Sequence, residues 1–171
     1  MNINAFKTQL LNGGARPNQF RVTLNWPAGV GSPGGDHNIL VTSAALPASN
    51  VNPTIVSYRG REVKFAGERT FDPWTVSIMN DTKLTLRSYF EKWSSLMNEY
   101  VNNGGTTAPG GYMADLICEQ LDRNDEVIRT YNIKNAFPTT VSEISLAYNA
   151  NDTISEFNVT FNYSHFEVAL P

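Results

Sequence analysis

The alternation of apolar and polar side chains is the feature that most constrains what this chain can fold into. Successive side chains of a strand point to opposite faces, so an apolar residue at every second position predicts a half-buried strand. Such segments recur along the whole chain and are separated by typical turn residues. The predicted strands cover residues 20–26, 39–46, 55–58, 63–65, 74–78, 114–121, 127–133, 141–148 and 154–165.

One stretch departs from this alternation and predicts a helix. Apolar side chains recur every third or fourth residue from Leu86 to Tyr100, and Asn80 and Asp81 before them are residue types that cap helix starts. We therefore expect one amphipathic helix at about residues 82–100. Its aromatic stripe favours core packing over a base-stacking platform, because leucine and methionine are interleaved with the aromatic residues.

Together these elements predict a mainly β fold. Eight or so strands and one helix indicate two packed antiparallel sheets, forming a partly closed barrel or sandwich with one flanking α-helix. At 171 residues, of which 41% are hydrophobic, the chain fits a single domain over residues 1–171. The segment Met1–Asn18 carries few periodic signals.

Turn residues predict where the strands are connected. Gly/Pro-rich segments near residues 27–37 and 102–112 indicate flexible loops, and residues 47–53 indicate a further turn. The charged run Gly67–Thr70 predicts the connection between the strands at 63–65 and 74–78. Two polar turns are predicted at residues 122–125 and 149–152.

Charge argues against a dedicated nucleic-acid binder. The net charge is −3, whereas such proteins are usually basic. Residues 1–80 hold seven basic and four acidic residues, and residues 81–171 hold six basic and twelve acidic residues. This asymmetry could draw copies of the chain together head to tail, or it could reflect uneven sampling of surface charge.

The residue types that catalysis and metal binding need are few and scattered. Cys118 is the single cysteine and lies in a predicted strand, as buried structural thiols do. His37 lies in a Gly-rich loop and His165 at a strand end, and neither has a triad partner nearby in the sequence. We expect no enzyme activity, no cofactor and no metal site. The segment Met1–Leu11 does not read as a signal peptide, and no apolar stretch is long enough to span a membrane.

A resemblance to a known family rests on several segments. The run Gly60–Asp81, with the sequence GREVKFAGERTFDPWTVSIMND, strongly resembles the tail tube proteins of contractile-tailed bacteriophages of the T4 type. This superfamily also includes the tube proteins of pyocins and type VI secretion systems. Further similarity lies at residues 15–22, residues 44–48, Arg87, Phe90, Trp93 and residues 137–139. The loops at 27–36 and 103–111 depart from the family.

The resemblance implies a structural protein of the virion. Members form hexameric rings that stack into the inner tail tube, which guides the tape-measure protein and later the genome. A sheath surrounds this tube and a baseplate initiates it, while DNA passes through without specific binding. Assembly is expected in the cytoplasm of the host bacterium, and the alternative is a tube protein of a phage-tail-like injection system or a type VI secretion system.

A stacked tube requires an interface that repeats along its axis without closing. An exposed strand–loop–strand with mixed charges at Tyr58–Phe71 could supply this ring-to-ring or subunit contact, whereas Trp74–Trp93 is expected to pack the core. Edge strands of neighbouring subunits could pair into an inner barrel, with acidic or neutral lumen residues on strands after residue 113. The predicted contact residues are Tyr58, Arg59, Arg61, Glu62, Lys64, Glu68, Arg69 and Asp72.

Overall fold

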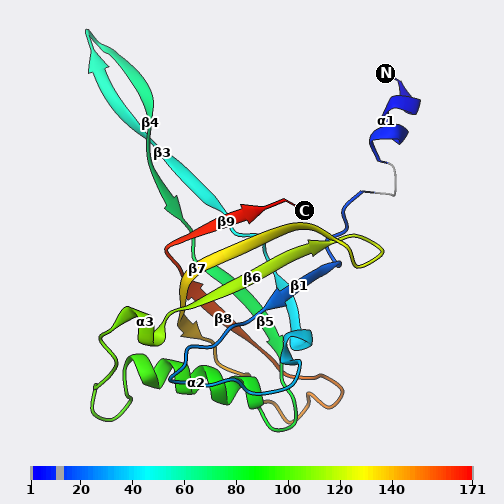
Figure 1. The fold of residues 1–171 in the computed structure, drawn as a ribbon, viewed down its shortest axis with the longest axis vertical. Helices are drawn as coiled ribbons and strands as arrows, with labels where there is room; N and C mark the ends of the chain where they lie inside the picture. Colours follow the sequence, from blue (N-terminus) through cyan, green and yellow to red (C-terminus); the bar gives the residue numbers. More distant parts are fainter. Residues whose placement is uncertain (1, 11–13, 171) are drawn as a thin grey trace.

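The computed structural model describes residues 2–10 and 14–170 and has a mainly β architecture, as predicted (Figure 1). The strands are β1 (Phe20–Thr23), β2 (Val41–Ala44), β3 (Ser49–Tyr58), β4 (Arg61–Phe71), β5 (Trp74–Met79), β6 (Ala114–Leu121), β7 (Val127–Val141), β8 (Glu156–Asn162) and β9 (His165–Ala169). The helices are α1 (Ile3–Gln9), the 3-10 helix η2 (His37–Leu40), α2 (Thr85–Met97) and α3 (Pro109–Tyr112).

The long strand β7 belongs to both halves of a seven-stranded antiparallel sheet. Its first part pairs with β9 on one side and with β6 on the other, and β1 follows β6; we call these strands the β6 half. Its second part pairs with β8, which is followed by β5 and β2; we call these strands the β8 half. The remaining strands, β3 and β4, form a separate two-stranded sheet. The expected pair of antiparallel sheets is confirmed, and the strands of residues 2–10 and 14–170 form no closed barrel.

The passage of β7 from one half to the other occurs at Asn135, whose backbone takes the left-handed value φ 55°. The carboxylate of Asp115 on β6 holds this position. Its Oδ1 accepts a hydrogen bond from the Asn135 backbone N–H at 3.0 Å, and its Oδ2 accepts one from Lys134 Nζ at 2.8 Å. The hydrogen bond from Lys134 is the main reason why the pKa of Asp115 lies below its usual value of 3.8.

One hydrophobic core joins both halves of the sheet to α2. Phe90 and Trp93 on α2 are fully buried. The Phe90 ring centroid lies 6.1 Å from that of Phe157 and 5.9 Å from that of Phe161, both on β8. Trp26, from the segment after β1, packs 4.8 Å from Phe90. Because such aromatic pairs combine large burial with favourable edge contacts, the helix is fixed against the sheet by its aromatic stripe.

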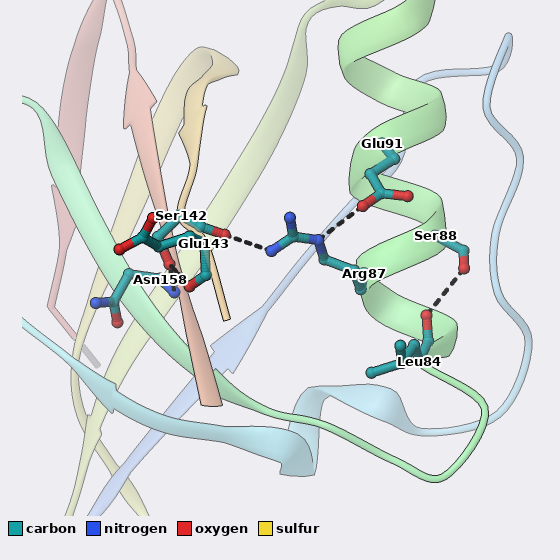
Figure 2. A network of polar contacts seen from close by, with 7 residues as sticks. All are labelled: Leu84, Arg87, Ser88, Glu91, Ser142, Glu143 and Asn158. Atoms are coloured by element: carbon teal, nitrogen blue, oxygen red, sulfur yellow. Dashed lines mark hydrogen bonds and ion pairs between the residues drawn. The ribbon is translucent and has the colours of Figure 1, made fainter. Parts of the chain in front are cut away.

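A polar contact also anchors α2 (Figure 2). The Arg87 guanidinium donates to the backbone carbonyl of Ser142, just after β7, and its Nε donates to Glu91 Oε1 at 2.8 Å. Ser142 Oγ in turn accepts a hydrogen bond from the Asn158 backbone N–H at 2.8 Å. Arg87 therefore ties the helix to the ends of β7 and β8.

The helix is shorter than the expected 82–100. It begins after Leu84, whose φ of 50° is incompatible with a helical turn, and it ends at Met97. Neither predicted cap residue stands at the N-cap position, yet Asp81 Oδ1 accepts a hydrogen bond from the Thr85 N–H at 2.6 Å. Tyr100, expected on the buried face, lies beyond the helix and is 70% exposed.

Two predicted connections in the first half are strands instead. The turn expected at 47–53 is the start of β3, and the connection expected at Gly67–Thr70 lies within β4. Strand β4 pairs with β3 through the turn at Arg59–Gly60 and not with β5. The segment expected as a strand at 39–46 begins in η2 and becomes extended at Val41.

The last third contains the largest differences. Strand β7 continues from Val127 to Val141, whereas the strand expected at 141–148 is an irregular segment. Its apolar residues Leu146 and Tyr148 are exposed, so none of the strands that the structure describes covers them. The strand expected at 154–165 divides at residues 163–164 into β8 and β9, which pair with different parts of β7.

The helices outside α2 were not predicted. Helix α1 lies in the segment expected to have few periodic signals and has no buried residue. Helix α3 is a single turn within the predicted loop 102–112. Met1 and residues 11–13, part of the same opening segment, lie outside the described residues.

The role of Asp115 predicts a pH-dependent stability difference. Asp115→Asn removes the charged acceptor at the bend of β7 and should lower the free energy of unfolding by about 1 kcal/mol at pH 7. Because the pKa of Asp115 is lowered in the folded state, its contribution is present above the unfolded value and is lost as pH falls below 3.8.

Urea unfolding of both proteins at pH 7 and pH 3 checks this. The gap between their unfolding free energies should narrow at pH 3. Asp152→Asn, the same change at an exposed residue, is the control and should have little effect at either pH. A gap for Asp115→Asn that is equal at both pH values would contradict the role given to the carboxylate.

Candidate functional site

Among the described strands, none other pairs with the hairpin of β3 and β4, which extends away from the seven-stranded sheet at the end opposite α2 (Figure 1). At about 3.4 Å per residue, the eleven residues of β4 span roughly 35 Å. The tip is a two-residue turn in which Arg59 (φ 48°) and Gly60 (φ 81°) are both left-handed, as a type I′ turn requires. An isolated two-stranded hairpin is marginal in water, which makes this hairpin the candidate contact surface of the described chain.

The register of the hairpin separates its side chains into two faces. Residues opposite each other share a face, and the pairs Val56–Val63, Thr54–Phe65 and Tyr58–Arg61 therefore lie on the same side. We call this side the apolar face. Phe65 is 57% exposed and Tyr58 is 63% exposed, so no other part of the described chain covers it.

The opposite side of the hairpin is mixed and partly charged. It carries the pairs Ser57–Glu62, Ile55–Lys64 and Pro53–Ala66. We call this side the charged face. No ion pair found among residues 2–10 and 14–170 involves Glu62 or Lys64, which leaves both charges available to another molecule.

All eight predicted contact residues lie on this hairpin or directly after it. At the tip, the Arg59 guanidinium lies 5.4 Å from the centre of the Tyr58 ring. At the base, Arg69 Nη1 donates to Ser49 Oγ at 3.0 Å, and Asp72 Oδ2 accepts from Asn50 Nδ2 at 2.8 Å. Five of the eight lie at the tip and middle of the hairpin: Tyr58, Arg59, Arg61, Glu62 and Lys64. The other three lie at its base: Glu68, Arg69 and Asp72.

The apolar half of this surface was not predicted. Alternation predicts Val63 and Phe65 on one side of a half-buried strand and assigns Val56 to no surface. The Arg59-Gly60 pair could have revealed this face, because it suits a two-residue turn. Such a turn would have fixed the register in which β3 pairs with β4. With that register, the three apolar side chains gather on one face.

Gly67 explains how β4 continues through a position that resembled a break. The register shifts here, so that two residues of β4 face one residue of β3. A Cβ at Gly67 would lie 2.5 Å from the Asn52 carbonyl oxygen and 2.6 Å from Thr54 Oγ1. The backbones approach too closely for any side chain, and this glycine permits the bulge at the base of the hairpin.

Within residues 2–10 and 14–170, the cysteine and the two histidines lie on separate elements. Cys118 is buried on β6, and burial raises its thiol pKa to about 11. His37 and His165 lie on η2 and β9. The described part of the chain contains no group of three or more His, Cys, Asp or Glu placed to hold a metal ion. None of its helices is long and apolar enough to cross a membrane.

Comparison with known proteins identifies the family. Residues 15–169 match the family described as phage tail tube protein. The chain belongs to the phage tail tube protein family. Tail tube protein gp19 of Enterobacteria phage T4 is 32% identical over 154 residues, covering 90% of this chain and 91% of that protein. The tail tube protein of Serratia phage KSP90 is 26% identical over 165 residues, covering 94% and 93%.

Solved structures show the same fold at lower sequence identity. A chain of the cryo-EM structure of an extracellular contractile injection system, the PVC sheath–tube complex in the extended state, superposes with a TM-score of 0.63 at 16% identity, covering 96% of this chain and 97% of that chain. A chain of the anti-feeding prophage tube terminating cap gives a TM-score of 0.65 at 18% identity, covering 92% of both chains. The tail tube fold is therefore shared with contractile injection systems.

Gly67 offers a test of the hairpin that leaves the core intact. Gly67→Ala should loosen β3 and β4 through the Cβ contact with Asn52, while the urea midpoint of the whole chain stays nearly unchanged. Hydrogen exchange of the β3 and β4 amides measures the effect and should be at least about tenfold faster, which corresponds to about 1.4 kcal/mol of local stability. Ala66→Ser, which also adds one heavy atom next to this position, should leave exchange unchanged.

Burial of Cys118 predicts a thiol that is inert in the folded chain. Because the thiolate is the reactive form and the pKa is about 11, iodoacetamide at pH 8 should modify Cys118 only after unfolding. Mass spectrometry of samples with and without urea measures this. Rapid alkylation of the folded chain would contradict the structural role of the residue.

Proposed function

We propose that this chain is the tail tube subunit of a contractile bacteriophage, and that hexameric rings of it stack into the conduit through which the genome is delivered. The exposed apolar face of the β3–β4 hairpin carries the proposal, because a tube subunit needs a surface that becomes buried only against another subunit. Membership of the tail tube family supports the same reading.

The hairpin is the ring-to-ring contact in this proposal. Burial of Val56, Val63 and Phe65 against a subunit of the next ring supplies the attraction, at about 1.5–3 kcal/mol for each side chain that becomes fully buried. The charged face, with Glu62 and Lys64, selects the orientation of the neighbouring subunit. A wrong orientation would bring charges of the same sign together, which is unfavourable. Arg69 and Asp72 hold the base of the hairpin and meet the same neighbour.

The role is structural and not catalytic, and it needs no cofactor. The other partners are the tail sheath protein outside the tube, baseplate proteins at its start, and the tape-measure protein in the lumen. DNA passes without specific binding. The subunit assembles in the cytoplasm of the host bacterium and ends as part of the virion tail.

The alternative is the tube of a phage-tail-like contractile injection system or a type VI secretion system. The shared fold with the PVC and anti-feeding prophage structures favours it, but their sequence identity is only 16–18%. The phage proteins are 26–32% identical over at least 90% of this chain. The higher identity supports the virion tail.

Negative-stain microscopy of the purified protein, alone and with baseplate as a seed, tests the proposal. Rings or tubes with sixfold end views are expected. A protein that remains monomeric at high concentration and also with the seed would refute it.

A pair of substitutions tests the proposed contact. Phe65→Asp places a charge in the apolar face and should shorten or abolish tubes while the subunit stays folded by circular dichroism. Tyr148→Asp makes a similar change at an exposed aromatic residue outside the hairpin and should leave tube length unchanged. Arg69→Glu should also weaken stacking. Equal tube yield and length for Phe65→Asp and the unsubstituted chain would rule out the apolar face.

A further inference from the structure

Helix α1 has an apolar side that no other part of the described chain buries. Ile3, Phe6 and Leu10 follow one another at spacings of three and four residues, so they lie on the same side of the helix. Lys7 lies on this side as well, and the opposite side carries only small and polar side chains. Phe6 is 65% exposed, and Ile3 and Leu10 are also exposed.

The cap of α1 does not by itself account for the helix. Asn2 Oδ1 accepts a hydrogen bond from the backbone N–H of Asn4 at 3.1 Å, as N-cap residues do. A helix of seven residues is nonetheless marginal in water, because few hydrogen bonds offset the cost of ordering the first turn. Most short helices are stabilised by packing an amphipathic side against another element. The apolar side of α1 is therefore expected to pack against a partner surface.

A groove of matching character lies between the two ends of the seven-stranded sheet. Strands β1 and β2 stand at these ends, and among the described strands they do not pair with each other. Instead, Asn38 Oδ1 on η2 accepts a hydrogen bond from the Leu24 N–H at 3.0 Å. The groove has a volume of about 400 Å³. Its apolar lining residues come from β1, η2, β2 and β6 and are Phe20, Val22, Ile39, Val41 and Leu121.

The charge of this β1–β2 groove complements that of α1. Lys7 is the one charged residue of the helix, and Asp36 lines the groove. Arg21 also lines the groove, but it is paired with Glu119 at 2.7 Å. No ion pair found within residues 2–10 and 14–170 involves Lys7 or Asp36. Attraction between these two side chains would set the orientation of the helix in the groove.

The segment before β1 directs α1 away from the groove of its own chain. One edge of β1 pairs with β6, and the groove lies at the other edge. Gln120 on β6 holds this segment, because its Nε2 donates to the Arg16 carbonyl at 2.7 Å and to the Gln19 carbonyl at 2.8 Å. The chain that leads to α1 is thereby fixed on the β6 side, and α1 stands apart from the sheet (Figure 1). The groove of another copy is the better placed partner.

We propose that α1 of one subunit lies in the β1–β2 groove of a second copy of this chain. Ile3, Phe6 and Leu10 have the spacing with which an amphipathic helix enters an apolar groove, and Lys7 meets Asp36. Helix and groove are different surfaces, so the contact is heterologous and can close into a ring. Its place between neighbours of one ring rests on the proposed function, whereas the contact between two copies does not.

Disulfide formation between two different chains tests this contact. Phe6→Cys and Ile39→Cys, each on its own chain, are mixed in equal amounts and mildly oxidised, and mass spectrometry identifies the disulfide that joins positions 6 and 39. The native Cys118 is buried and gives little background. Tyr148→Cys replaces Ile39→Cys in the control mixture, because Tyr148 is exposed and lies outside the groove. The mixture with Ile39→Cys should give at least about tenfold more mixed disulfide than the control.

A single chain that carries both Phe6→Cys and Ile39→Cys separates the two possible origins of the helix in the groove. A disulfide that forms within this chain at high dilution, but not between the mixed chains, would place α1 in its own groove. Absence of the disulfide from both samples would leave the groove without α1. Either result overturns the proposal.

Charge reversal tests the orientation of the helix. Lys7→Asp on the chain with Phe6→Cys should lower the yield of mixed disulfide at least about threefold, because position 7 would then repel Asp36. Adding Asp36→Lys to the chain with Ile39→Cys should restore the yield. A loss that the second reversal does not restore would overturn the pairing of Lys7 with Asp36.

Negative-stain microscopy of the unsubstituted chain distinguishes failure of this contact from failure of the proposed function. Tubes without the mixed disulfide would overturn the contact alone. The disulfide without rings or tubes would support the contact and refute the proposed function, and the absence of both would overturn both.

Discussion

The double pairing of β7 is the constraint on which the rest of the fold depends. The first part of β7 pairs with β6 and β9, and its second part pairs with β8. The position of β7 therefore fixes the register of the strands next to it in both halves of the sheet. The bend at Asn135 brings the apolar sides of both halves to one core, where α2 completes the packing. Asp115 stabilises that bend from the neighbouring strand.

The molecule separates the residues that hold it together from those offered to other molecules. Phe90, Trp93 and Phe161 are fully buried, and the body of the fold does not need the β3–β4 hairpin to cover them. The hairpin instead leaves Phe65 and its neighbours in water. Substitutions at the contact surface can therefore alter assembly without unfolding the subunit, which makes the two properties separable by experiment.

The sequence predicted the elements whose apolar face is covered by the chain's own core. Strands β5 and β6 lie where alternation placed them, and the aromatic stripe of α2 is buried as expected. Alternation did not predict the exposure of the β3–β4 hairpin. It identifies an apolar face, but it does not show whether the same chain or another copy covers that face. It also failed at β7, since nothing in the residues around Asn135 distinguishes a strand that bends from a strand that ends. The eight predicted contact residues lie on the β3–β4 hairpin or directly after it, but their apolar neighbours could be identified only from the register of β3 with β4.

The pairing of β1 with β6 has a consequence for how the subunit reaches its folded state. Arg21 and Glu119, which meet in this pair, are separated by 98 positions in the chain. Contacts so distant in sequence form slowly, because a long loop must close before they are gained. The β3–β4 segment is local and can form early, and it presents its unpartnered edges and apolar side chains both during that delay and in the folded subunit. The late pairing of β1 with β6 therefore delays completion of the body of the subunit and not the appearance of the surface that other copies can meet.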